Sequence, residues 1–319
     1  MNEIKFEKIQ DFADILHLTK NSLCRMLRYK KYKTFKIKKK NGQYREINSP
    51  KFELKIIQKW ILINILEKQP LPDFVMAFRK HKNGLKEGAL LHKDNSYLLK
   101  MDLSDFYPSI SFSMVKNMFL KIGFSEFESK VFTHFCTYNN KLPQGGVTSP
   151  YISNLIFNFF DIKIKKYADE RNIIYTRYAD DLIFSSNSKE DLIKIKNFVY
   201  ILINKYSRFR INKEKTKFFK PSQHKKVTGI TINNELIKVN KKLKQDVRMT
   251  LYNLFKNNHF EKRYTKEKLI GTISYIHLIE DAPNEYGYIN NCIKYISNLM
   301  VKNNSISDFG LLKTLQQMK

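Results

Sequence analysis

At 319 residues and 42% hydrophobic side chains, the chain can form two or three packed subdomains and is too apolar to remain disordered. Its 58 Lys and Arg against 30 Asp and Glu give a formal charge of +28 that favours a polyanion, above all nucleic acid, with a membrane surface as the competing interpretation. No apolar run approaches the roughly 20 residues of a spanning helix and the N-terminus lacks a signal-peptide core, so a cytoplasmic protein without a membrane partner is expected.

The first elements predicted are two short helices before residue 29 and then a basic β-hairpin over residues 33–48. Asn41-Gly42 supplies the turn, because both residue types accept the positive φ that a two-residue hairpin turn needs. Aromatic residues such as Tyr32 and Phe35 alternate with lysines here. This mixture suits a surface that follows phosphates and stacks on bases, and it equally suits a strand with a solvated lysine face, so both interpretations stay open.

A strand predicted at Tyr97–Leu103 carries Asp102 near its C-terminal end, where a carboxylate would lie at the rim of a sheet. The segment KLPQGGVTSP, residues 141–150, consists of residue types that interrupt helices and strands, and it predicts a loop. Apolar residues at helical spacing predict helices over 52–67, 112–122, 126–137, 151–171 and 188–206.

The hairpin Ile173–Ser185, IIYTRYADDLIFS, places Asp180 and Asp181 at the bend between two apolar strands. Surface charge is abundant elsewhere, so a cation site explains these adjacent acids better than solubility does. Adjacent strand residues point to opposite faces, and Asp180 is expected to face Asp102 more directly than Asp181 does. A lysine-bearing segment at 209–219, a β-rich run at 226–233 and a helical region from about 238 follow.

The three acids Asp102, Asp180 and Asp181 could hold magnesium if their two strands lie side by side. Magnesium prefers oxygen ligands and is commonly held by one or two carboxylates plus substrate phosphates. Two such ions about 3.5 to 4 Å apart can activate an attacking hydroxyl and stabilise a leaving group. Without metal, clustered carboxylates repel one another and raise each other's pKa, and bound cations reverse that effect.

Four segments in order resemble the consecutive palm motifs of reverse transcriptases: MDLSDFYPSI, PQGGVTSPYISNLIF, YTRYADDLIFS and the lysine-bearing NKEKTKF. GQYREINSP with the following ELKIIQKWI resembles the first fingers motif, so the similarity covers most of residues 33–233. Within that class, the compact length and the Val227-Thr228-Gly229 triplet look most like a retron-type bacterial reverse transcriptase. Ala89 to His92 resembles a second retron signature, although Gly88 stands where Asn is expected.

The resemblance implies an α+β fold with the right-hand architecture of polymerases. N-terminal helices and fingers would occupy residues 1–100. The palm, with the antiparallel sheet that carries the YADD hairpin, would occupy 101–237, with fingers helices interleaved at about 112–140. Residues 238–319 would form a helical, RNA-binding thumb.

The resemblance also implies roles for individual residues. Asp102, Asp180 and Asp181 would be catalytic acids that hold two Mg²⁺ ions, or Mn²⁺ in substitution, together with the backbone carbonyl of Leu103. Tyr107 would lie under the sugar of the incoming dNTP and exclude a 2′-hydroxyl. Nucleotide contacts would come from Tyr107, Gln144, Gly145, Arg45, Lys80 and Lys215, the last as a proton donor to pyrophosphate. Primer or RNA contacts would come from Tyr178, Val227, Thr228, Gly229 and His92.

The implied function is RNA-directed DNA polymerisation on a cognate structured noncoding RNA, primed from a guanosine 2′-hydroxyl. The product would be a branched RNA-DNA hybrid, msDNA, used in anti-phage defence. Partners would be that RNA, the msDNA, dNTPs, an accessory effector protein and a host RNase H. Two alternatives remain: another small bacterial reverse transcriptase, diversity-generating or intron-derived, and a catalytically idle RNA-binding scaffold, against which three acids at one rim argue.

Overall fold

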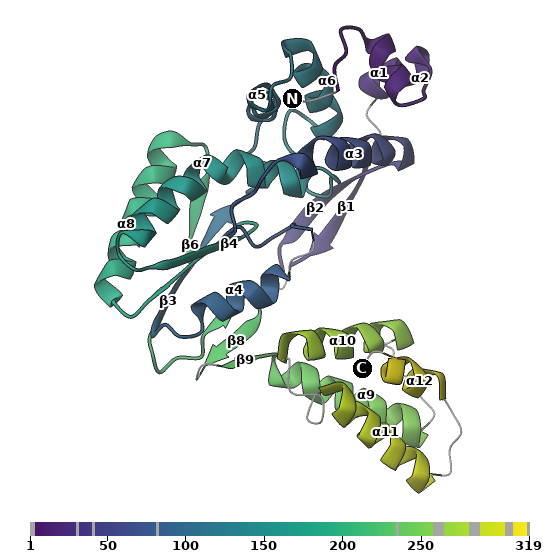
Figure 1. Ribbon diagram of the computed structural model, residues 1–319, viewed down its shortest axis with the longest axis vertical. Helices are drawn as coiled ribbons and strands as arrows, with labels where there is room; N and C mark the ends of the chain where they lie inside the picture. Colours follow the sequence, from purple (N-terminus) through teal and green to yellow (C-terminus); the bar gives the residue numbers. More distant parts are fainter. Residues whose placement is uncertain are drawn as a thin grey trace. The chain divides into compact units, whose positions relative to one another are not determined.

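The computed structural model describes residues 4–29, 32–39, 42–80, 83–233, 236–257, 265–280, 288–303 and 309–317. The chain divides into two compact units, the first Met1–Lys82 with Tyr97–Phe218 and the second Asn83–Ser96 with Phe219–Lys319 (Figure 1). Each unit has its own cluster of buried apolar side chains. The predicted domain boundaries at residues 100 and 237 stay predictions. The two compact units instead divide the chain after Lys82, Ser96 and Phe218.

The first unit has a helical part and two sheets. Its helices are α1 (Ile9–Ile15), α2 (Lys20–Arg28), α3 (Phe52–Asn64), α5 (Phe112–Ile122), α6 (Glu126–Cys136), α7 (Ser149–Asp169) and α8 (Lys189–Tyr206), with a 3₁₀ turn at Leu66–Lys68. Its strands are β1 (Tyr32–Lys38), β2 (Tyr44–Pro50), β3 (Tyr97–Ser104), β4 (Ile174–Tyr178), β5 (Asp181–Ser186) and β6 (Arg210–Phe219). The helices predicted from apolar spacing are confirmed.

The central sheet has the strand order β4-β5-β3-β6, and β5 pairs antiparallel with both β3 and β4. Helices α7 and α8 pack against this sheet (Figure 1). Helix cover explains why β3 and β5 are buried along most of their length. The segment 209–219, predicted as mixed strand and turn, is the strand β6.

Aromatic rings at the ends of β3 and β6 pack against helix α7. Phe106, just after β3, contacts the rings of Phe157 on α7 and Phe209 before β6, with centroid distances of 5.7 and 5.6 Å. Phe157 and Phe209 also meet edge to face at 5.3 Å. Edge-to-face aromatic pairs each add about 0.5–1.5 kcal/mol beyond the apolar area they bury. Through Phe106, this cluster includes the segment that follows Asp102.

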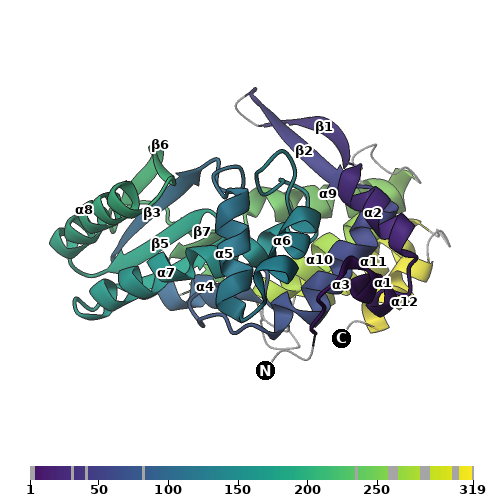
Figure 2. The ribbon, with the colours of Figure 1, turned by 90° about the horizontal axis from the view of Figure 1, so that it is seen from above.

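The predicted basic hairpin is a separate two-stranded ribbon, β1 with β2, which projects beyond the helices of its unit (Figure 2). Phe35 pairs with Ile47 and Ile37 pairs with Arg45, so these four side chains share one face. Phe35 is 42% exposed and Ile37 is 50% exposed. The ribbon therefore presents apolar side chains to solvent on a strand that also carries several lysines.

The second unit combines a small sheet with helices. Helix α4 (Gly84–His92) packs on the antiparallel strands β7 (Lys226–Val227), β8 (Ile230–Asn233) and β9 (Leu236–Lys238). Four helices follow: α9 (Lys241–Asn257), α10 (Lys266–Glu280), α11 (Tyr288–Asn303) and α12 (Phe309–Gln317). Within the described residues, the predicted helical region from about 238 is confirmed.

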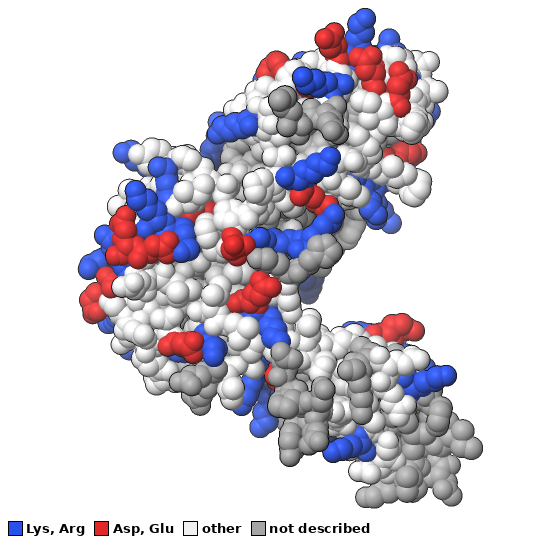
Figure 3. Space-filling model, viewed as in Figure 1, with Lys and Arg blue, Asp and Glu red and all other residues white. Residues whose placement is uncertain are grey.

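The positive charge is distributed over the surface of both units. On the face drawn in Figure 3, Lys and Arg side chains are scattered over both units with Asp and Glu between them. In the part of the chain that the structure describes, no helix has both the length and the apolar character needed to cross a membrane.

Candidate active site

A cavity of about 340 Å³ opens where β3 ends in the first unit. Seven of the residues predicted for the site line it: Arg45, Asp102, Leu103, Tyr107, Gln144, Asp180 and Lys215. Four other predicted residues of this unit, Asp181, Gly145, Lys80 and Tyr178, do not line it. Lys39, Gln43, Asn212 and Glu214 also line the cavity, and sequence reasoning did not single them out for this role.

The three acids meet because β3 and β5 run side by side. The register places Asp102 directly opposite Asp181, so their side chains leave the sheet on the same face. Asp180 lies in the turn between β4 and β5, and its backbone carbonyl accepts the Leu103 N–H at 3.0 Å. Asp181 is thus the sheet partner of Asp102, while Asp180 shares the cavity with it.

Burial and mutual repulsion disfavour the ionised form of Asp180 and Asp181. The pKa of Asp180 is raised, first by burial and further by the charge of Asp102, while Lys215 and Arg45 lower it. The pKa of Asp181 is also raised, first by burial, with Asp180 and Asp102 adding to the effect. Bound cations at this rim would offset that cost.

Lys215 already places one positive charge on the acids. Its Nζ donates to both carboxylate oxygens of Asp102, at 2.9 and 3.0 Å. Asn212 helps to position it, because the Asn212 side-chain carbonyl accepts the Lys215 backbone N–H at 3.2 Å. Among the described residues, no three His, Cys, Asp or Glu side chains form a ready metal site. The oxygen-only donor set of the three acids fits a divalent cation, which at Asp102 would take the place of the ammonium group.

Tyr107 lines the same cavity as Asp180. The Tyr107 side chain lies close to Ser153 on α7, whose hydroxyl donates to the Pro150 carbonyl at 2.7 Å. Burial, with the charge of Asp180, raises the pKa of Tyr107 to about 12, so the side chain is a neutral phenol at physiological pH. The ring is therefore an uncharged surface, which is suited to contact with a sugar.

The PQGG loop is held against β2. Gly145 has φ +115°, and a Cβ there would lie 2.9 Å from Ile47 Cγ2 and 3.0 Å from the Asn48 carbonyl oxygen. The Asn48 N–H donates to the carbonyl of Gln144 at 2.8 Å. Only glycine accepts both this backbone angle and this approach. The loop thereby fixes Gln144 at the cavity.

Gln58 on α3 fixes the other end of the same loop. Its Oε1 accepts the Val147 N–H at 2.9 Å, and its Nε2 donates to the Phe135 carbonyl and the Tyr32 hydroxyl at 2.8 and 2.9 Å. Gln58 is fully buried. Sequence reasoning missed it, although a Gln among the apolar positions of a predicted helix is a usable signal, because buried amides need partners.

Two predicted contact residues of the first unit lie outside this cavity. The Lys80 ammonium group forms an ion pair with Glu67. Tyr178 ends β4, and its ring lies 6.3 Å from that of Phe78. Tyr178 is opposite Asp181 in the sheet, so it stands beside the acids without lining the cavity.

The predicted RNA-contact residues of the second unit gather around its small sheet. His92 is fully buried, and burial lowers its pKa to about 3, so it is neutral. Val227 is buried as well. Thr228 and Gly229 form the β7–β8 turn with φ +47° and +91°, and the Thr228 hydroxyl is buried with no hydrogen-bond partner in the described structure. A β-branched residue at positive φ is strained, a feature that clusters at functional sites.

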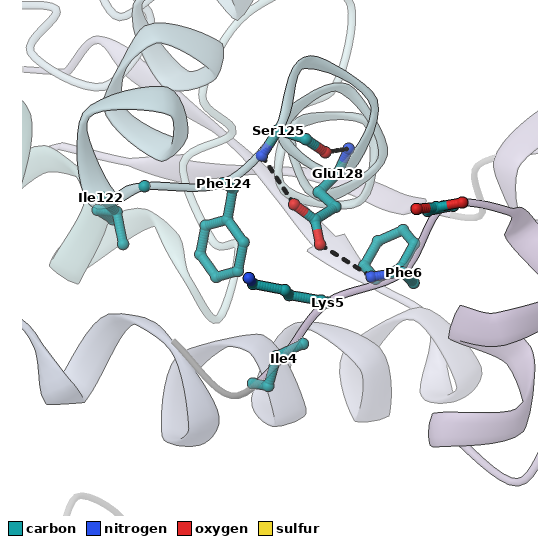
Figure 4. Close-up of a pocket in the computed structure, with 9 residues that line it drawn as sticks. Ile4, Lys5, Phe6, Ile122, Phe124, Ser125 and Glu128 are labelled. Atoms are coloured by element: carbon teal, nitrogen blue, oxygen red, sulfur yellow. Dashed lines mark hydrogen bonds between the residues drawn. The ribbon is translucent and has the colours of Figure 1, made fainter. Parts of the chain in front are cut away.

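A second cavity, of about 640 Å³, lies beside the N-terminal segment (Figure 4). Its one buried acid is Glu128, whose carboxylate accepts the backbone N–H groups of Phe6 at 2.9 Å and Ser125 at 2.7 Å. Ser125 in turn accepts the Glu128 N–H, so the pair caps α6. Glu128 therefore anchors the N-terminal segment, whereas the cavity at β3 is lined by the predicted acids Asp102 and Asp180.

Comparison with known proteins agrees with this geometry. The sequence model of reverse transcriptase (RNA-dependent DNA polymerase) matches residues 37–232. The chain is 33% identical over 274 residues to the retron Ec86 reverse transcriptase of Escherichia coli, covering 85% of this chain and 82% of that one. It is 32% identical over 288 residues to the E. coli retron Ec73 reverse transcriptase, covering 84% and 90%. A Myxococcus xanthus relative, the retron Mx162 reverse transcriptase, is 28% identical over 79% of this chain and 58% of its own length.

A solved structure supports the fold. A telomerase from Candida albicans, in complex with a TWJ fragment of telomeric RNA, superposes with a TM-score of 0.51 at 11% identity. The match covers 92% of this chain and 62% of the telomerase chain, so this chain spans less than two thirds of that protein. At this identity the likeness concerns the fold alone, and it confirms the predicted α+β polymerase architecture.

Proposed function

We propose that the template of this protein is a cognate structured noncoding RNA. The chain belongs to the retron reverse transcriptases and is an RNA-directed DNA polymerase, and this membership is the starting point of the proposal. Synthesis begins from a guanosine 2′-hydroxyl within that RNA, and the product is a branched RNA-DNA hybrid, msDNA. The observation that carries the proposal is that Asp102, Asp180, Tyr107 and Gln144 line the same cavity in a chain with retron relatives. The formal charge of +28 suits a large nucleic-acid partner.

In this proposal Asp102, Asp180 and Asp181 are the catalytic acids and hold two Mg²⁺ ions, with the Leu103 carbonyl nearby. The ions, when bound, supply electrostatic stabilisation of the attacking and leaving oxygens. The raised pKa values of Asp180 and Asp181 support this role, because burying carboxylates so close together is costly without a cation.

The nucleotide pocket is assigned to the remaining cavity residues. Tyr107 lies under the sugar of the dNTP and leaves no room for a 2′-hydroxyl. Gln144 contacts the nucleotide, and Gly145 lets the loop approach β2 closely. Arg45 supplies positive charge for the triphosphate, as does Lys80 if it leaves Glu67. Lys215, released from Asp102, donates a proton to the leaving pyrophosphate.

RNA contact is assigned to Tyr178 beside the acids and to the Thr228-Gly229 turn. The strain at Thr228 and its unpaired hydroxyl support a ligand at that turn. Val227 and His92 are buried, and they support the turn from beneath through the packing of α4 on β7 and β8. The thumb, proposed as residues 238–319, would bind RNA as well.

Membership of the retron family supports a proposed cellular role. We place the msDNA in anti-phage defence together with an accessory effector protein, in the cytoplasm, with host RNase H removing template RNA. A diversity-generating or intron-derived enzyme is less consistent with relatives such as the retron reverse transcriptases, which are 25 to 34% identical to this chain. An idle scaffold would not need buried acids with raised pKa values.

The test is to sequence the nucleic acid that copurifies with the protein expressed in its own host. A short single-stranded DNA joined to RNA through a 2′,5′ linkage is the expected result. Mixed RNA without DNA would support a scaffold and overturn the proposal. DNA without a branch would point to another class of bacterial reverse transcriptase.

A further inference from the structure

Arg177 lies on β4, three residues before Asp180, and its side chain is fully buried. Its Nε donates to both carboxylate oxygens of Asp161 on α7, at 2.9 and 3.0 Å, and its Nη2 donates to Asp161 Oδ2 at 2.6 Å. The Tyr175 hydroxyl donates to the same carboxylate at 2.7 Å. The charge of Arg177 is thus balanced inside the protein by one acid.

The remaining end of the guanidinium reaches the catalytic turn. Arg177 Nη1 donates to the side-chain carbonyl of Asn154 at 2.9 Å and to the backbone carbonyl of Ala179 at 3.0 Å. Ala179 has φ +55°, a left-handed conformation that costs a non-glycine residue about 1–2 kcal/mol. The next residue is Asp180. The hydrogen bond therefore holds a strained peptide whose orientation determines where Asp180 points.

Helix α7 joins this turn to the nucleotide pocket. The Asn154 side-chain carbonyl accepts a hydrogen bond from Arg177, and its neighbour Ser153 lies close to Tyr107. Both α7 side chains are fully buried. Asn154 also donates to the Ala77 carbonyl at 2.9 Å. One turn of α7 thus contacts the arginine that holds the acid-bearing turn and lies beside the tyrosine that lines the nucleotide pocket.

Stability alone does not account for a buried ion pair at this position. Desolvating an arginine and an aspartate costs several kcal/mol per ion, and apolar side chains of similar volume are often as stable or more so. The bidentate geometry of arginine instead fixes direction, since its donors lie in one rigid plane. Here one of those rigidly oriented donors holds the Ala179 carbonyl.

We propose that Arg177 is a positioning residue for DNA synthesis, which acts by holding the Ala179 carbonyl and so orienting Asp180 against the nucleotide pocket. It touches neither substrate nor metal. The inference rests on the proposed catalytic role of Asp180. It gives a role to Arg177, which lies within the motif YTRYADDLIFS but received no role from the sequence analysis.

The decisive variant is Arg177→Lys, which keeps a positive charge for Asp161 and cannot also reach Asn154 and Ala179. The matched control is Tyr175→Phe, which removes a hydrogen bond from the same buried carboxylate and leaves the Ala179 turn untouched. Single-nucleotide primer extension gives kcat and the KM for dNTP, and thermal unfolding gives the stability of each full-length protein. Asn154→Ala serves as a second variant if Arg177→Lys does not fold.

Arg177→Lys is expected to lower kcat by about 10- to 100-fold with little change in KM, because small displacements of a catalytic group have effects of that size. Tyr175→Phe is expected to lose stability and keep kcat. Equal kcat in the two variants at matched stability overturns the inference, as does a normal kcat in Arg177→Lys or Asn154→Ala. Asp180→Asn is assayed alongside: if it stays active, the proposed catalytic role fails first, and if it is dead while Arg177→Lys is normal, only the positioning role fails.

Discussion

Replacing Gly145 by alanine tests whether the close approach of the PQGG loop to β2 sets the nucleotide pocket. The matched control is Gly123→Ala. Both glycines have positive φ, +115° and +106°, but a Cβ at Gly123 meets nothing within 4 Å. Both variants therefore carry the cost of a left-handed alanine, about 1–2 kcal/mol.

Only the Gly145 variant adds an overlap. Its Cβ would lie 2.9 Å from Ile47 Cγ2 and 3.0 Å from the Asn48 carbonyl oxygen, and the second of these is backbone that cannot rotate away. Overpacking of this kind costs about 1–3 kcal/mol. The loop can relieve it by moving off β2, which breaks the bond from the Asn48 N–H to Gln144 and displaces Gln144 from the cavity.

We expect kcat/KM for dNTP to fall by about 10- to 100-fold in Gly145→Ala, equivalent to about 1.4–2.7 kcal/mol of transition-state stabilisation. Single-nucleotide primer extension over a range of dNTP concentrations measures this loss, and thermal unfolding measures stability. The reasoning is refuted if Gly145→Ala stays within twofold of Gly123→Ala in kcat/KM, or if the two variants unfold at the same temperature.

Three further predictions concern the acids and the pocket wall. The double change Asp180→Asn with Asp181→Asn should abolish DNA synthesis while RNA binding survives in a filter-binding assay, and persistent synthesis would contradict the site. Because the folded pKa of Asp181 is raised above the ordinary 3.8, its contribution to stability is present below that value and lost as the pH rises through the raised pKa. Metal-free Asp181→Asn should thus melt higher than the unchanged protein at neutral pH, with a gap that narrows toward pH 3.8; a gap independent of pH argues otherwise. Tyr107→Ala should incorporate ribonucleotides more readily, whereas Tyr107→Phe should not, and unchanged dNTP/rNTP selectivity in the alanine variant removes the gate role.

Local patterns predicted the elements and the acids well. Two apolar runs on either side of Ala179-Asp180 predicted the β4–β5 hairpin, and helical spacing predicted α3 and α5–α8, because these signals lie within single segments. The pairing of β3 with β5 brings together acids nearly eighty positions apart, and the order of the motifs was enough to predict it.

Long-range packing was the part that sequence patterns did not predict. Nothing local indicates that Arg177 pairs with Asp161, that Gln58 anchors the PQGG loop, or that Lys215 lies on Asp102. Each of these depends on which faces of distant elements meet. The relation among the acids was also only half accessible, since a strand alternation rule does not say that Asp180 belongs to a two-residue turn.

The second unit is formed from two segments that are far apart in the sequence, and this affects how it folds during synthesis. Helix α4 leaves the ribosome early, yet the strands on which it packs, β7 to β9, begin only at Lys226. At roughly 5–20 residues per second, the stretch between His92 and Lys226 takes on the order of ten seconds to translate. During that interval the apolar side of α4 has no sheet to cover it. Nascent chains paused in this window should therefore be the ones most dependent on chaperones.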